Sequence, residues 1–138
     1  MVISLFINSP IILRRWNSSI FINRLNESNI PFTYFELAPL DQLQKMYGSC
    51  DLYVVGSRHE GGPQSILEAS AMKVPIISTD VGIASAVLAP NCVFDVSSKM
   101  YTPTEEDVSE CFERVQAFEL KSYTEKYIDL FREMVGSS

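Results

Sequence analysis

Two glutamates, Glu60 and Glu68, stand on either side of a Gly-Gly-Pro turn in the stretch SRHEGGPQSILEASAMKVPIIST, residues 57–79. The segment between them contains the turn and the start of an apolar, helix-forming run. Both carboxylates can therefore face one pocket at the end of a strand. Because carboxylates accept hydrogen bonds from hydroxyl groups, this spacing predicts a ligand site.

The turn and the helix after it predict a site for an anion. Gly61-Gly62-Pro63 lets the backbone approach a ligand closely, and the free N–H groups near Gln64 and Ser65 suit a phosphate. Glu68, inside the helix, can accept hydrogen bonds from the paired hydroxyls of a ribose. Glu60 stays on the loop, close to whatever the phosphate carries. The alternative makes Glu68 a surface helix residue and Glu60 a solvated loop residue.

Two further polar residues precede the turn. Ser57 ends the predicted strand, and His59 is the single histidine of the chain. We interpret His59 either as a hydrogen-bond donor to sugar or phosphate oxygens or as an exposed loop residue. The sequence contains no GxSxG motif for a hydrolase nucleophile and no CxxC pair for zinc, so neither chemistry is indicated.

The composition predicts one soluble domain. A chain of 138 residues with 46% hydrophobic residues can build a single core, so we expect residues 1–138 to form one domain. The net charge of -6 argues against a broad nucleic-acid or anionic-membrane surface. Cys50, Cys92 and Cys111 read as reduced core thiols of a cytoplasmic protein. Apolar runs are too short for a membrane span, which leaves peripheral membrane contact possible.

Strand and helix patterns alternate along the chain. The expected strands are 2–8, 32–37, 51–57, 74–79 and 91–96, and the expected helices are 17–29, 40–47, 63–73 and two closing helices capped by Thr104 and Ser122. This alternation predicts an α/β fold, a Rossmann-like doubly wound parallel sheet with helices on both faces. In such folds the ligand lies beyond the carboxyl ends of the strands, where residues 57–64 fall.

The central third of the chain resembles a known family. The matching residues are Met46-Tyr47, Cys50-Asp51-Leu52, Ser57, Glu60-Gly61-Gly62-Pro63, Glu68-Ala69, Ala71, Pro75, Ser78-Thr79 and Val81-Gly82. They resemble the C-terminal, donor-binding domain of the GT-B glycosyltransferases, especially the retaining family called group 1 or family four. The shared features are a strand ending in serine, an E-x7-E motif and a PIIST-x-VG strand and loop, over about forty residues.

The resemblance implies a function for the glutamates. It assigns Glu68 to the ribose of a nucleotide-sugar and Glu60, as the catalytic residue, to the positive charge that develops at the anomeric carbon. The backbone of residues 61–65 would contact sugar hydroxyls and diphosphate. The implied reaction is a retaining hexosyl transfer from a donor such as a UDP- or GDP-sugar to a glycan or lipid-linked acceptor, as in polysaccharide biosynthesis. No cofactor or metal is implied, and the sequence has no DxD motif.

The sequence also departs from the family pattern. It holds neither the N-terminal acceptor-binding domain nor the GR...KG stretch whose Arg and Lys hold the diphosphate. Arg14, Arg15 or Arg58 either substitutes for that stretch or is a solvated surface cation. Lys73 stands where the family usually has Gly.

The closing helix carries an apolar face of Tyr127, Ile128, Phe131, Met134 and Val135. We expect this face to pack on the chain's own sheet. The alternative is a partner surface, because in the family the C-terminal helix crosses back onto the N-terminal domain.

Three functions follow from these observations. The first is the donor-binding part of a glycosyltransferase, whose acceptor-binding domain comes from another chain or from residues that this sequence does not include. The second is a catalytically inactive nucleotide-sugar-binding or regulatory partner module with a GT-B-like fold. The third is another GT-B enzyme such as a 2-epimerase, which would need acid–base residues that the sequence does not display.

Overall fold

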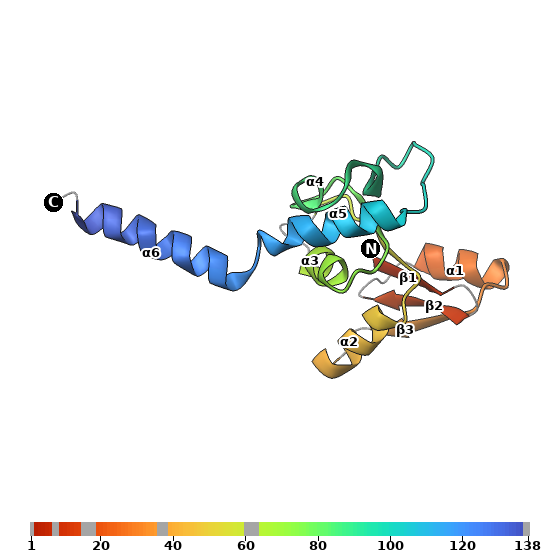
Figure 1. The fold of residues 1–138 in the computed structure, drawn as a ribbon. Coiled ribbons are helices and arrows are strands. Elements are labelled where there is room, and N and C mark those ends of the chain that lie inside the picture. The colour runs from red at the N-terminus through yellow and green to blue at the C-terminus, as the bar shows by residue number, and fades with distance from the viewer. Residues whose placement is uncertain (1, 7–8, 15–18, 36–38, 60–63, 137–138) are drawn as a thin grey trace.

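The computed structural model describes residues 2–6, 9–14, 19–35, 39–59 and 64–136, and Figure 1 shows their arrangement. The described strands are β1 Val2–Phe6, β2 Ser9–Arg14, β3 Phe32–Phe35, β4 Leu52–Val55, β5 Ile76–Thr79 and β6 Val93–Phe94. The described helices are α1 Ser19–Glu27, α2 Leu40–Gly48, α3 Gln64–Ala71, α4 Ala84–Val87, η1 Pro90–Cys92, α5 Glu105–Gln116 and α6 Leu120–Gly136. The expected alternation of strands and helices is confirmed, and α4 and η1 are additional short turns of helix.

The sheet has the strand order β3-β2-β1-β4-β5-β6. β2 pairs with β3, β4 with β5, and β5 with β6, all in parallel, whereas β1 is antiparallel to both β2 and β4. Every described strand except β1 therefore runs in the same direction, and the fold class is α/β as expected.

The N-terminal hairpin differs from the sequence-based expectation. The first strand was expected over 2–8 with no strand between it and the helix at 17–29, but Ser9 and Pro10 begin a second strand, β2. Only residues 7 and 8 connect β1 to β2, and so short a link joins antiparallel neighbours, because a parallel pair needs a long crossover. The proline lies at the start of its strand, next to the register shift between Ser4 and Phe6, where its missing N–H is tolerated.

The register aligns the ends of the strands that carry the site. Val2 pairs with Arg14 on one side and with Val55 on the other. The carboxyl ends of β2 and β4 therefore lie level at one edge of the sheet, separated by β1. The segments that follow β2, β4 and β5 all leave the sheet at this edge.

Helices cover both faces of the sheet, as expected. Tyr53 and Val55 of β4 belong to the larger core cluster, together with Ile66 and Ala69 of α3. Val54, between them in sequence, instead joins a smaller cluster with Leu25 of α1 and Ile77 of β5. Because successive strand residues point to opposite faces, α1 covers one face, and α2, α3, α4 and α5 cover the other.

The start of α5 is fixed by a capping box, as predicted for Thr104. The Thr104 hydroxyl accepts a hydrogen bond from the backbone N–H of Asp107, and the Asp107 carboxylate accepts one from the backbone N–H of Thr104. These hydrogen bonds from Thr104 hold the pKa of the Asp107 carboxyl below its usual value.

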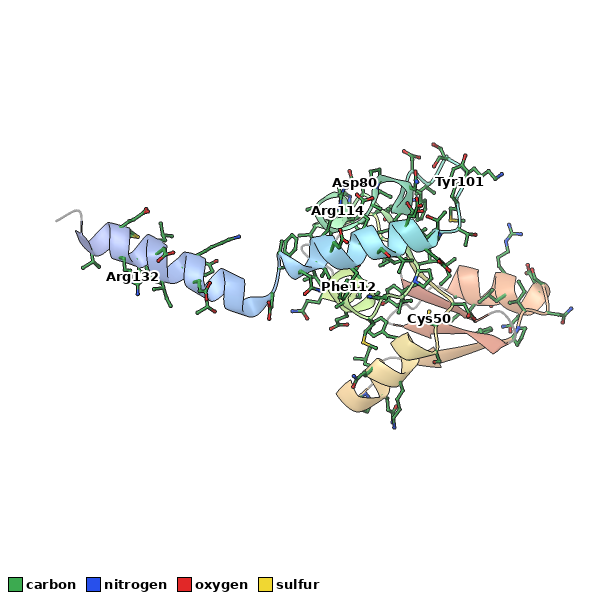
Figure 2. All side chains as sticks on the ribbon, viewed as in Figure 1. Cys50, Asp80, Tyr101, Phe112, Arg114 and Arg132 are labelled. Atoms are coloured by element: carbon green, nitrogen blue, oxygen red, sulfur yellow. The ribbon has the colours of Figure 1, made fainter. Side chains whose placement is uncertain are left out.

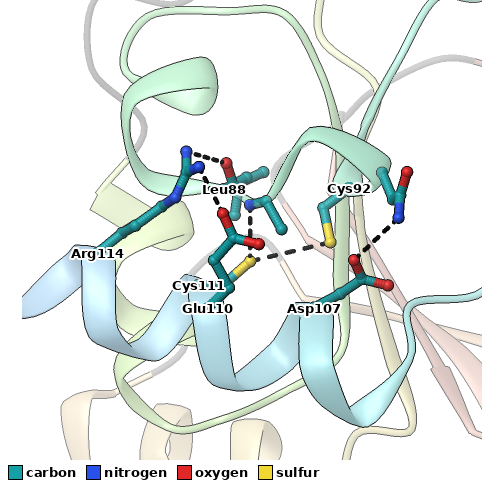
Figure 3. A network of polar contacts seen from close by, with 8 residues as sticks. Leu88, Cys92, Asp107, Glu110, Cys111 and Arg114 are labelled. Atoms are coloured by element: carbon teal, nitrogen blue, oxygen red, sulfur yellow. Dashed lines mark hydrogen bonds and ion pairs between the residues drawn. The ribbon is translucent and has the colours of Figure 1, made fainter.

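A polar network ties α5 to the segment around α4 and η1 (Figure 3). Arg114 donates to the backbone carbonyl of Leu88 at 2.9 Å, and the backbone N–H of Ala89 donates to the Sγ atom of Cys111 at 3.2 Å. The Sγ atoms of Cys111 and Cys92 lie 3.9 Å apart. Cys92 and Cys111 are buried in the core, as predicted, whereas Cys50 is half-buried; none of the three forms a disulfide in the part of the chain that the structure describes, and their reduced state stays a prediction.

The closing helix differs from the expectation in two respects. α6 begins at Leu120, so Ser122 lies inside the helix and the predicted cap at that residue is wrong. The apolar face also does not pack on the sheet: Ile128, Phe131 and Met134 are 42%, 59% and 65% exposed. After the turn that follows α5, the helix extends away from the rest of the fold, as Figure 2 shows around Arg132.

Within the ranges that the structure describes, no helix has both the length and the apolar character needed to cross a bilayer.

Candidate functional site

The predicted site residues gather where β4 passes into α3. Ser57 is buried, whereas His59 and Gln64 are exposed, and Ser65 and Glu68 are half-buried on α3. Glu60, Gly61, Gly62 and Pro63 lie outside the described residues, so their predicted roles stay predictions. The described residues on both sides of this gap lie at the carboxyl-end edge of the sheet, where the fold predicts a ligand.

Thr79, the last residue of β5, fixes the backbone that leads into the loop. Its hydroxyl donates to the carbonyl oxygen of Ser57 at 2.6 Å, and the carbonyl oxygen of Val55 lies 3.4 Å away. Thr79 is 7% exposed, so this hydrogen bond is sheltered from water. The ends of two adjacent parallel strands are thereby held together at the start of the candidate site.

Glu68 is held by a buried tyrosine from another helix. The hydroxyl of Tyr47, near the end of α2, donates to Oε2 of Glu68 at 2.8 Å. Tyr47 is 5% exposed and packs on the ring of Tyr53, with the ring centroids 5.3 Å apart. Among the described residues, the bond from Tyr47 is the one hydrogen bond that the Glu68 carboxylate makes, and it uses Oε2.

The environment of Tyr47 keeps its hydroxyl protonated. Burial, the neighbouring Tyr53 and the Glu68 carboxylate together raise the pKa of Tyr47 well above its usual value near 10. A neutral phenol in this position keeps its proton and donates a hydrogen bond to the carboxylate. Glu68 is therefore contacted by a permanent donor.

A cavity of about 360 Å³ opens beside Glu68. Its lining consists of Leu67, Glu68, Ala71, Val115, Gln116, Phe118 and Glu119. At the other end of α3, Lys73 lies over the ring of Phe112, 4.3 Å from the ring centroid. α3 and α5 therefore run antiparallel, and α5 ends at the same edge of the sheet at which α3 begins. Four of the seven lining residues are apolar, and Glu68 is one of the polar ones.

A second cavity, of about 390 Å³, lies near Pro75 and the capped start of α5. Pro75 precedes β5, so this cavity is at the amino end of the parallel strands, away from the predicted site residues. Among the residues that the structure describes, no group of three or more His, Cys, Asp and Glu side chains is arranged to hold a metal ion.

The basic residues expected near a diphosphate occupy two places. Arg14 is the last residue of β2 and, through Val2, lies level with the end of β4. Neighbouring strands are spaced about 4.8 Å apart, so the Arg14 backbone is about 10 Å from that of Val55 at the same edge. Arg58 is exposed on the segment after β4. Arg15 lies outside the described residues.

Two contributors to the site were not predicted as such. Tyr47 and Thr79 were expected only as residues of the family pattern, Tyr47 at the end of a helix and Thr79 at the end of a strand. Sequence spacing cannot reveal either contact, because each joins residues more than 20 positions apart. A hydroxyl at the end of an apolar face is the only signal that either residue offers.

Comparison with known proteins identifies the family to which this chain belongs. The family model described as glycosyl transferases group 1 matches residues 18–115, which include both glutamates, Tyr47 and Thr79. Among solved structures, a chain of the GtfA/B complex is similar, with a TM-score of 0.45 and 17% sequence identity. The similarity covers 78% of this chain but 22% of that chain, so the present chain spans about a fifth of its length. None of the curated proteins matches this chain. Because the family model covers most of the chain, including the strands and helices that form the candidate site, the chain belongs to the group 1 glycosyl transferases.

Proposed function

We propose that this chain is the donor-binding domain of a retaining, metal-independent glycosyltransferase of family four, corresponding to the C-terminal domain of a GT-B enzyme. It binds a nucleotide-sugar, such as a UDP- or GDP-hexose, and supports transfer of the hexosyl group to a glycan or lipid-linked acceptor. One observation carries this proposal. The Glu68 carboxylate, one turn into the helix that begins at the carboxyl-end edge of the sheet, accepts a hydrogen bond through Oε2 from the buried Tyr47 hydroxyl, and no other partner binds it among the described residues.

The chemistry of Glu68 fits a ribose. A carboxylate accepts hydrogen bonds only, and the two adjacent hydroxyls of a ribose are donors at matching spacing. Glu68 lies four residues after Gln64, the first residue of α3. A ribose at Glu68 thus leaves the attached diphosphate near the start of the helix, where free N–H groups and the helix dipole favour negative charge.

In this proposal the transfer itself takes place at the loop before α3. The acceptor hydroxyl attacks the anomeric carbon, the bond from that carbon to the diphosphate oxygen breaks, and the hydroxyl proton goes to the departing diphosphate. The Glu60 carboxylate lies beside the sugar and stabilises the positive charge that develops at the anomeric carbon. His59 and Ser57 flank the loop and contribute hydrogen bonds to the sugar or the phosphates.

The diphosphate also needs cations, and an acceptor-binding domain must face this edge of the sheet. Arg14, the last residue of β2, and Arg58, on the segment after β4, take the first role in this proposal. An N-terminal GT-B domain, on this or another chain, supplies the second. We place the reaction in the cytoplasm, in keeping with the sequence-based expectation that the cysteines are reduced thiols.

Calorimetric titration with UDP, GDP and ADP, and then with their sugar conjugates, tests the proposal. We expect one nucleotide to bind and Glu68→Ala to weaken its binding at least about tenfold, since hydrogen bonds to a charged group are lost. The matched control is Glu113→Ala, an exposed glutamate on α5, which should leave the affinity unchanged.

Either of two results would reject the donor site. One is the absence of binding for every nucleotide at millimolar concentration. The other is equal loss of affinity in the Glu68 and Glu113 variants. Nucleotide binding without sugar transfer, after a separate acceptor domain is supplied, would favour the inactive binding module instead.

A further inference from the structure

We propose that Tyr47 is a positioning residue for the donor site: its buried hydroxyl orients the Glu68 carboxylate so that this carboxylate selects a ribose over a deoxyribose. This inference rests on the proposed function. It adds a second residue, on a different helix, to the recognition of the sugar of the nucleotide.

The geometry of the contact supports this role. Tyr47 Oη and Glu68 Oε2 are 2.8 Å apart, which is an ordinary distance for a hydrogen bond donated by a hydroxyl. The two residues are 21 positions apart in sequence and lie on different helices, α2 and α3. The contact therefore depends on the tertiary fold.

Tyr47 is itself rigidly placed, which a positioning residue requires. Its side chain is 5% exposed and belongs to the main core cluster. Its ring packs on Tyr53, which is 2% exposed, and the two hydroxyl oxygens are 3.5 Å apart. A hydrogen-bond donor that is fixed by core packing restricts the orientation of the Glu68 carboxylate. An exposed, mobile donor would change conformation together with the carboxylate and would not restrict it.

Glu68 needs such a partner, because it is half-buried and borders an open cavity. A glutamate side chain has three rotatable bonds, and ordering it costs on the order of 1 to 2 kcal/mol. When Tyr47 holds Oε2, that ordering is complete before a ligand arrives. The remaining acceptor positions of the carboxylate then have one defined orientation, in which they can accept hydrogen bonds from the two hydroxyls of the proposed ribose.

A purely structural role makes a different prediction. If the hydrogen bond only joined α2 to α3, its loss would lower stability and weaken all nucleotides equally. If Tyr47 orients Glu68, its loss must reduce the discrimination between nucleotides that have the ribose hydroxyls and nucleotides that lack them. The ratio of the two affinities separates these roles.

The experiment measures that ratio by calorimetry, with UDP, GDP and ADP and their 2′-deoxy and 3′-deoxy counterparts. We expect the wild-type chain to prefer the ribonucleotide that it binds by at least about tenfold. Tyr47→Phe keeps the ring and removes only the hydroxyl, and it should reduce the preference to about two- to threefold. Glu68→Ala should abolish the preference.

Three controls keep the test decisive. Tyr127→Phe, on the exposed part of α6, should leave the preference unchanged. Thermal melting of Tyr47→Phe establishes that the variant is folded, and Tyr47→His, with a ring donor of different reach, should not restore the preference.

The outcomes distinguish this inference from the proposed function. If wild type prefers the ribonucleotide and folded Tyr47→Phe retains the full preference, the positioning role is wrong and the donor site stands. If the affinities of Tyr47→Phe for both nucleotides fall in equal proportion, the role is structural and the inference fails. If wild type binds no nucleotide, the proposed function fails and the inference fails with it.

Discussion

Thr79 shows how a single hydroxyl can organise the candidate site. Its side chain is not predicted to contact the ligand. It donates a hydrogen bond to the carbonyl of Ser57, which lies at the start of the loop that contains Glu60. A buried carbonyl that loses its donor keeps its desolvation cost, so this position is sensitive to a change that preserves shape.

We predict that Thr79→Val lowers the free energy of unfolding by about 1 to 2 kcal/mol, because valine fills the same space without the hydroxyl. The same change should weaken nucleotide binding several-fold. Urea unfolding measures the first effect and calorimetry the second. Thr79→Ser, which retains the donor, should keep more of the nucleotide affinity than Thr79→Val; the reverse order would show that the hydroxyl does not hold the loop.

At the scale of elements, the backbone at the end of α3 explains why the family usually has glycine at the position of Lys73. Lys73 has a positive φ of 54°, and the hydrogen bonds from Val74 N to Ala69 O and from Lys73 N to Ser70 O form a Schellman motif. Glycine is favoured at this position because it has no Cβ to clash. The contact between the Lys73 ammonium and the Phe112 ring partly offsets the strain.

Lys73→Gly should raise the free energy of unfolding by up to about 1 kcal/mol, since relief of the left-handed conformation outweighs loss of the ring contact. Lys73→Ala is the matched comparison, because it loses the contact and keeps the strain, and it should be less stable than wild type. Urea unfolding of the three proteins tests the order. A glycine variant less stable than wild type would mean that the contact with Phe112 dominates.

Some elements could be predicted from sequence and others could not. The Thr104 cap, the helix containing Glu68 and the edge strand at 93–94 follow from local patterns, and the structure confirms them. The strand that begins at Ser9 was missed, because Ser-Pro is a common loop signal and only pairing with β1 makes it a strand. The contact of Tyr47 with Glu68 depends on how α2 and α3 pack, which no local pattern determines.

At the scale of the whole molecule, α6 stands apart from the body of the fold (Figure 1). Its described side chains, from Thr124 onward, are all exposed. An amphipathic pattern predicts that a helix has an apolar face, but it does not identify the surface that covers the face. The sequence-based expectation of packing on the sheet failed for this reason.

Removal of residues 120–138 should therefore change the melting temperature by less than about 4 °C, since little buried surface is lost. Differential scanning calorimetry of the shortened chain checks this prediction. Removal of residues 105–138 is the contrasting variant and should abolish cooperative melting, because α5 contributes Cys111 and Val115 to the core. A large drop for the first variant would mean that α6 packs on the body in solution.

The reversed direction of β1 has a practical consequence for experiments on this chain. Val2 lies level with Arg14 and Val55, so the chain enters the sheet at the edge proposed to bind the donor. An affinity tag joined ahead of Val2 would emerge next to that edge and could compete with a nucleotide for access. A tag that follows α6 would lie at the far end of the extended helix, which makes the C-terminal end the better attachment point for purification and for immobilisation on a sensor surface.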